Sequence, residues 1–98
     1  MPLFVISWRD KPNAFETRAG AREAHLASIG TLGDKAKLGG PYLDDEGRMI
    51  GSLMIIEADS LEAVQAIHDR DPYKLAGLFD SSTITPWRLT VQTFGGGS

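Results

Sequence analysis

The sequence predicts an α+β fold with the element order β-α-β-β-α-β. Short apolar runs rich in β-branched and aromatic residues alternate with longer stretches that show the 3.6-residue period of a helix. Clusters of Gly, Pro, Asn and Asp separate these segments. This order is the split, ferredoxin-like arrangement. The 98 residues, 42% of them hydrophobic, suffice for one small domain. We therefore expect a single domain over residues 1–94 and a flexible Gly/Ser tail at 95–98.

The first half of the chain is expected to form a strand, a helix and a second strand. Residues 3–8 (LFVISW) are apolar with β-branched and aromatic members, as in a buried strand. Residues 15–32 have a helical pattern, and residues 36–43 (AKLGGPYL) predict a strand weakened by its glycines. The apolar face of the helix is expected to comprise Phe15, Ala19, Leu26 and Ile29.

A hairpin turn, a strand and a second helix follow. Residues 44–48 (DDEGR) have the acidic and glycine residues of a hairpin connection, and residues 52–58 (SLMIIEA) predict a strand. Ser60 then stands where a helix N-cap is expected, before the helical pattern of residues 61–69.

The last segments are a short helix and a terminal strand or strand pair. Asp71 suits an N-cap and Pro72 suits the first helical position, so a third helix is predicted at the DPY sequence. Residues 82–94 predict the final strand or pair, in which Pro86 favours an edge, a bend or a bulge.

The two most apolar strands carry apolar side chains on both faces. Two helices cover only one face of a four-stranded sheet, and a chain of 98 residues has no further element for the other. Because homo-oligomers are mostly two-fold symmetric dimers, a second copy of the chain is the simplest cover. We therefore expect a homodimer, with partly enclosed apolar space near its interface as a candidate ligand pocket.

Composition excludes several classes of function. A net charge of −3 argues against nucleic acid as a partner. The absence of cysteine excludes disulfides and thiolate chemistry, and the two histidines have no metal-ligand spacing, so no metal and no cofactor are expected. The N-terminal apolar run is too short to span a membrane and lacks the features of a signal peptide. A cytoplasmic protein without membrane partners is expected.

Three polar residues of the first helix fall on one stripe. Arg18, Arg22 and His25 are spaced i, i+4 and i+7, and the helical wheel puts Arg22 within the apolar face. A buried arginine needs an anion or carbonyl partner, which favours a pocket for an anionic ligand. The alternative is an arginine that extends its head to the sheet edge beside a structural histidine. His68, near the end of the second helix, is interpreted as a structural residue that interacts with the helix C-terminus.

Four segments resemble the YciI-like, or YCII-related, family. They are residues 10–26 (DKPNAFETRAGAREAHL), 39–42 (GGPY), 51–66 (GSLMIIEADSLEAVQA) and 71–79 (DPYKLAGLF). The most specific motifs are RxxxRxxHL from Arg18 and DPY from Asp71. The resemblance implies a dimeric α+β barrel of ferredoxin-like subunits.

The same resemblance implies a site. By the motif match, its histidine and aspartate are His25 and Asp71, and its serine is Ser52. Members of the family include a dehydrochlorinase acting on a chlorinated hydroxyhydroquinone, and related barrels include muconolactone isomerase. The family therefore implies a small-molecule enzyme without specifying the reaction.

These residues suggest cofactor-free acid–base chemistry, by a lyase or isomerase, on a small anionic or phenolic substrate. His25 would move the proton and Asp71 would orient its imidazole while also capping the third helix. Arg22, with Arg18, would hold the anionic group. Tyr73 and Ser52 would donate hydrogen bonds. The alternatives are a non-catalytic small-molecule-binding or regulatory dimeric domain, and a purely structural dimer module.

Overall fold

The computed structural model describes residues 2–92, so the expected tail at 95–98 and the predicted end of the last strand lie outside the described residues. The chain follows the predicted β-α-β-β-α-β order, with a short third helix before the last strand. Its elements are β1 (Leu3–Asp10), α1 (Phe15–Gly30), the 3₁₀ turn η1 (Gly33–Lys35), β2 (Ala36–Leu43), β3 (Met49–Glu57), α2 (Leu61–Asp69), α3 (Pro72–Leu75) and β4 (Phe79–Trp87).

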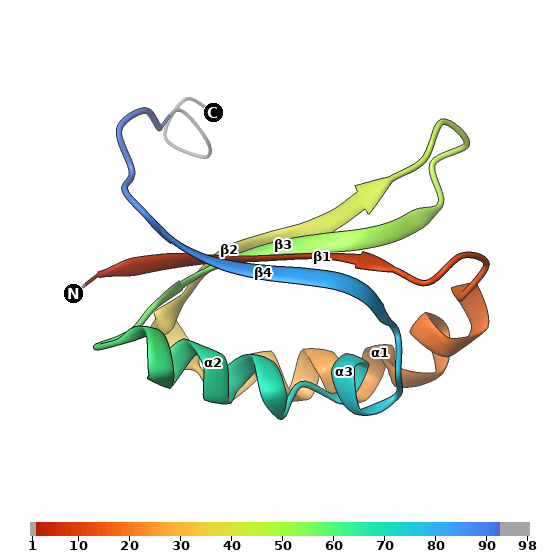
Figure 1. Cartoon of the computed structure of the whole chain (residues 1–98), viewed down its shortest axis with the longest axis horizontal. Coiled ribbons are helices and arrows are strands. Elements are labelled where there is room, and N and C mark those ends of the chain that lie inside the picture. Colours follow the sequence, from red (N-terminus) through yellow and green to blue (C-terminus); the bar gives the residue numbers. More distant parts are fainter. Residues whose placement is uncertain (1, 93–98) are drawn as a thin grey trace.

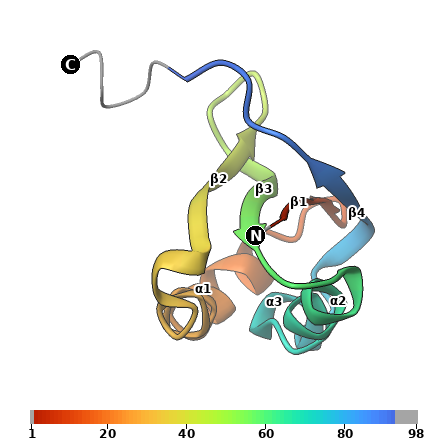
Figure 2. The same ribbon diagram turned by 90° about the vertical axis from the view of Figure 1, so that its left-hand side faces the viewer.

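The four strands form one antiparallel sheet in the order β2-β3-β1-β4. All three helices lie on the same face of this sheet (Figure 1), and the end-on view shows the opposite face free of helices (Figure 2). The predicted ferredoxin-like α+β fold is confirmed.

Element boundaries follow local chemistry. Ser60 Oγ accepts a hydrogen bond from the Ala63 N–H at 3.2 Å, and Asp71 Oδ1 accepts one from the Tyr73 N–H at 2.8 Å. Both predicted helix caps are therefore confirmed. Pro86 lies in β4, an edge strand of the sheet, where a missing N–H donor is tolerated.

The last strand begins earlier than predicted. It starts at Phe79, directly after a turn in which Gly77 has φ of 76°, a conformation that glycine adopts without steric cost. It ends at Trp87, and residues 88–92 form no strand. The described part of this segment is therefore a single strand and not a strand pair.

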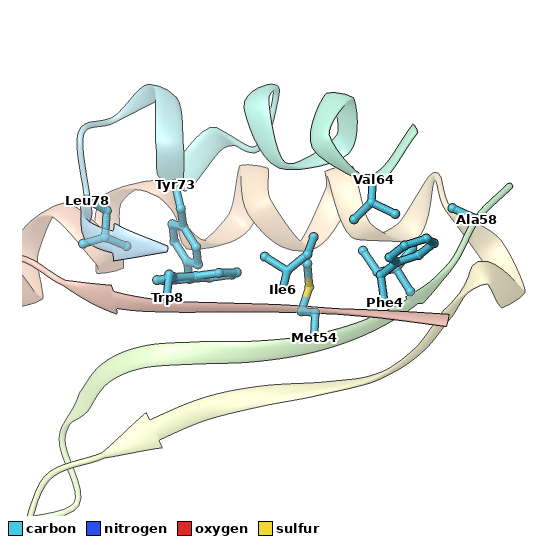
Figure 3. Close-up of a cluster of buried hydrophobic side chains, with 9 residues drawn as sticks. Phe4, Ile6, Trp8, Met54, Ala58, Val64, Tyr73 and Leu78 are labelled. Carbon is cyan, nitrogen blue, oxygen red and sulfur yellow. The ribbon is translucent and has the colours of Figure 1, made fainter. Parts of the chain in front are cut away.

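The hydrophobic core fills the space between the sheet and the helices (Figure 3). Alternate residues of β1 point to the helical face, as the two-residue period of a strand requires. Side chains from β3, α2 and α3 complete the cluster. Its members include Phe4, Ile6, Trp8, Met54, Ile56, Val64, Tyr73 and Leu78.

The buried face of α1 differs from the prediction. Ala19 is exposed and Leu26 is 51% exposed, although both were expected to pack on the sheet. The buried residues of this helix are instead Arg18 and His25, which are 6% and 7% exposed. Arg22, predicted to lie within the buried face, is exposed.

Hydrogen bonding explains this rotation of α1. Arg18 and His25 both find buried polar partners on other elements, so each of these two buried side chains faces a carboxylate. Ala21, on the same side, is small enough to let the helix approach the core, against which it and Ile29 are packed. A helical wheel of hydrophobicity gives no information about such partners, because they lie on other elements.

The helix-free face of the sheet is apolar at one end. Val5 and Ile55 are paired neighbours on it, and Ile55 is only 5% exposed. Leu89 and Val91, in the segment after β4, share a hollow of about 500 Å³ with Leu38 and Ile55. The predicted two-faced apolar character of the central strands is therefore present.

Candidate active site

A pocket of about 350 Å³ lies on the helical side of the sheet, between α1 and strands β2 and β3. Five of the six predicted site residues line it, and Asp71, the sixth, lies behind His25. Apolar side chains such as Leu26, Ile29 and Met54 form much of the remaining wall. The five predicted residues that line it are Arg18, Arg22, His25, Ser52 and Tyr73.

His25 is held by Asp71. Its Nδ1 lies 2.9 Å from Oδ1 and 3.0 Å from Oδ2 of Asp71, and both side chains are largely buried. Within residues 2–92, Nε2 of His25 makes no hydrogen bond. An ionised carboxylate is only an acceptor, so in the neutral imidazole this contact puts the proton on Nδ1 and leaves the Nε2 lone pair for a ligand.

Two aromatic rings fix the plane of this imidazole. Tyr73 stacks on His25 with ring centroids 4.0 Å apart and an interplanar angle of 16°. Trp8 meets the same ring edge-on, at 6.0 Å and 82°. Three different elements, β1, α1 and α3, therefore meet around one histidine, and its orientation depends on the packing of the core.

Arg18 makes a hydrogen-bond network that the sequence analysis missed. Its Nε and Nη2 donate to the two carboxylate oxygens of Asp10 at 2.7 and 3.1 Å. Nη2 also lies 2.9 Å from the Gly51 carbonyl oxygen and 3.1 Å from Ser52 Oγ. The only sequence signal for Asp10 was a carboxylate that ends a buried strand just before the turn into α1. Arg18 is therefore the buried arginine with an anionic partner that had been expected at Arg22.

Arg22 lies on the pocket wall with its side chain exposed. It forms no ion pair within the described part of the chain. The pocket therefore has one arginine whose charge is offset by Asp10 and one whose charge is not.

Burial raises the pKa of the Tyr73 phenol above its usual value of 10.0. The positive charges of Arg18 and Arg22 oppose part of this effect. The phenol consequently stays protonated at neutral pH and is a hydrogen-bond donor to any ligand in the pocket it lines.

The second histidine lies outside the pocket. Nε2 of His68 is 3.0 Å from Ser82 Oγ, and its ring centroid is 5.3 Å from that of Phe79. These contacts join α2 to β4, which agrees with a structural role. Residues 2–92 contain no group of three or more His, Cys, Asp or Glu side chains placed to hold a metal ion. Among the helices described, none combines the length and apolarity needed to cross a membrane.

Comparison with known proteins identifies the family. The sequence model of the YCII-related domain matches residues 2–88. The chain belongs to the YCII-related family. Protein YciI of Escherichia coli O6:H1 is 38% identical over 94 residues, covering 88% of this chain and 96% of the relative. An uncharacterized protein of Haemophilus influenzae is 31% identical over 93 residues, covering 87% and 95%.

Solved structures agree with this assignment. 5-Chloro-2-hydroxyhydroquinone dehydrochlorinase (TftG) of Burkholderia phenoliruptrix, in complex with 2,5-dihydroxybenzoquinone, is 35% identical with a TM-score of 0.82. The match covers 88% of this chain and 93% of that one. A NIPSNAP family protein of Agrobacterium tumefaciens, with a TM-score of 0.57 and 16% identity over 91% and 92% of the two chains, shares the fold alone. A structurally similar protein with 35% sequence identity is thus a dehydrochlorinase that binds a small molecule.

Proposed function

We propose that this protein is a cofactor-free lyase or isomerase that uses His25 and Asp71 as an acid–base pair on a small anionic or phenolic substrate. The observation that carries the proposal is the contact of His25 Nδ1 with both oxygens of Asp71, which leaves Nε2 free beside a pocket of about 350 Å³. The similarity to a dehydrochlorinase supports the same reaction class.

In this proposal Nε2 of His25 accepts a proton from an acidic O–H or C–H group of the substrate. The electron pair of the broken bond moves into the conjugated substrate. In an isomerisation, another substrate atom receives the proton. In an elimination, a halide ion leaves with its bonding electrons, and the proton and the halide are released beside the unsaturated product. Asp71 stabilises the imidazolium formed in between.

The rest of the pocket suits such a substrate. Arg22 supplies a positive charge that no described carboxylate offsets, and the Tyr73 phenol donates a hydrogen bond. The apolar wall that includes Leu26 and Met54 accommodates a ring and lowers the local dielectric, which strengthens these contacts.

The test is turnover of 5-chloro-2-hydroxyhydroquinone, followed anaerobically by chloride release. His25→Gln should lower kcat about 10²- to 10⁴-fold, the usual contribution of a general base. His68→Gln is the matched control, because it alters the other buried histidine outside the pocket, and it should retain wild-type turnover.

Two outcomes would contradict the proposal. Undiminished turnover by His25→Gln would show that His25 does not take part in the chemical step. A wild-type protein that binds hydroxyquinones tightly but turns over neither this substrate nor related halogenated or enolisable ring compounds would instead be the non-catalytic binding domain.

We further propose that two copies pair through the helix-free face of the sheet. Leu38 and Trp87 lie on that face with 48% and 38% of their surface exposed to solvent. Together with the more buried Ile55, they line its hollow. Pairing of two such surfaces would remove this apolar area from water.

A further inference from the structure

The guanidinium group of Arg18 donates hydrogen bonds to protein acceptors from Nε and Nη2. Its Nε and Nη2 groups together carry three N–H bonds, and these meet four acceptors on Asp10, Gly51 and Ser52. No geometrically well-formed hydrogen bond from its Nη1 group is found within residues 2–92, although the guanidinium lies close enough to the Tyr73 phenol to oppose the rise in its pKa, and Nη1 is accessible to solvent. Because Arg18 lines the pocket, the two N–H bonds of Nη1 are available to a ligand there.

Ser52 is oriented by the same contact. Its Oγ accepts a hydrogen bond from Arg18 Nη2 at 3.1 Å. A hydroxyl oxygen that accepts a hydrogen bond from an arginine points its own hydrogen away from that arginine. Ser52 Oγ has no other hydrogen-bond partner among the described residues. Ser52 lines the pocket and is 6% exposed, so its hydrogen is also available to a ligand.

We infer that Asp10 is a positioning residue that holds Arg18 and Ser52 as a joint pair of hydrogen-bond donors for an oxygen anion of the ligand. Asp10 does not line the pocket and acts only through Arg18. The bidentate contact fixes the guanidinium plane, since two parallel N–H···O bonds permit one orientation. This inference rests on the proposed function, because it assigns the group that stabilises negative charge while His25 moves the proton.

The arrangement defines which ligand the pocket prefers. Arg18 Nη1, Ser52 and Tyr73 each have an N–H or O–H hydrogen to donate, and no carboxylate lines the pocket within the described residues. Asp10 offsets the charge of Arg18, so this pair contributes directed hydrogen bonds, whereas Arg22 contributes charge. The ligand class is therefore a small anion with two or more acceptor oxygens, and the apolar wall of the pocket suits a ring in such a ligand.

The experiment measures binding of 2,5-dihydroxybenzoquinone by calorimetry to wild type, Asp10→Asn, Ser52→Ala and the double variant. Asp10→Asn should weaken binding at least about tenfold, because hydrogen bonds from charged groups are involved. The double variant should lose less than the product of the two single losses, because both residues contact Arg18 and both substitutions disturb the same donor pair. Asp44→Asn is the matched control: Asp44 also pairs with an arginine, Arg48 at 3.0 Å, but in the hairpin turn, so binding should stay within about twofold.

A second measurement uses the wild type, so that loss of folding in a variant cannot obscure the result. In ¹H–¹⁵N spectra, the guanidinium signals of Arg18 should shift on addition of the quinone, while those of Arg48 should not. Unchanged Arg18 signals, multiplicative losses in the double variant, wild-type affinity in Asp10→Asn, or no binding to the wild type at millimolar quinone would each overturn the inference. Binding that depends on Asp10 without any turnover would overturn the proposed function alone.

Discussion

At the residue scale, Asp71 combines two tasks that the chemistry of a carboxylate allows. Oδ1 accepts the Tyr73 N–H at 2.8 Å as the cap of α3, and both oxygens face Nδ1 of His25. An ionised carboxylate has acceptor capacity for all these contacts. Removing the side chain would therefore remove a cap, at a cost of about 1 kcal/mol, and also release the histidine.

The tautomer of His25 is the first prediction. Neutral His25 should be protonated at Nδ1 only, because that nitrogen faces the carboxylate. Long-range ¹H–¹⁵N spectra distinguish the two tautomers. Asp71→Ser, which keeps a cap acceptor but removes the carboxylate, should relax this preference. An Nε2–H tautomer in the wild type would contradict the assignment of Nε2 as the proton acceptor.

Tyr73 provides a pH prediction. Burial raises the pKa of its phenol above 10.0 in the folded protein, so the folded state retains this proton after the unfolded chain has lost it. The stability linked to this proton is therefore complete below about pH 10, and it is lost as the pH rises through the folded-state pKa. Urea unfolding between pH 9 and 12 should show a steeper loss for wild type than for Tyr73→Phe. Parallel curves would show that Tyr73 is not the group responsible.

At the element scale, the close approach of β1 and β3 determines where the polar side of the pocket lies. A Cβ atom added to Gly51 would meet the Trp8 carbonyl oxygen of the neighbouring strand, and the Gly51 carbonyl itself accepts a bond from Arg18. Glycine thus allows the backbone of β3 to contact β1 directly while presenting an acceptor to α1.

Replacing this glycine should be costly. Gly51→Ala is expected to lower the free energy of unfolding by about 1–3 kcal/mol or more, because the contacted atom belongs to the backbone and cannot move aside. Gly40→Ala, in the adjacent β2, is the control, since nothing lies within 4 Å of its added Cβ. Its unfolding free energy should stay within about 0.5 kcal/mol of wild type in urea denaturation. Equal effects of the two variants would exclude the steric explanation.

At the scale of the whole molecule, the open face of the sheet predicts self-association. Sedimentation equilibrium at micromolar concentration should give a dimer. Val5→Lys, which places a charge on the face that carries Ile55, should shift the equilibrium to monomer, since burying an unpaired charge is very unfavourable. Ala24→Lys, on the exposed side of α1, should leave the dimer intact. A wild-type monomer under these conditions would defeat the proposed pairing.

The sequence alone was sufficient for the order of the elements and for the starts of the two helices that have side-chain caps, but not for the ends of the strands. Strand composition, helix periodicity and the caps Ser60 and Asp71 act through neighbouring residues, so they can be read without the fold. The start of β4 was misplaced by three residues, because a turn at Gly77 and pairing with Asp10 decide it. The family motifs pointed to His25 and Asp71, which the structure brings into contact.

The rotation of α1, by contrast, was decided only by the tertiary structure. Hydrophobic periodicity placed Leu26 and Arg22 on the buried face, yet the helix buries Arg18 and His25. The physical reason is that a buried polar side chain is tolerated only where it has hydrogen-bond partners. Those partners, Asp10 and Asp71, come from other elements. The sequence by itself determined which residues are available for chemistry; the packing of β1, α1 and α3 decided which of them face one another.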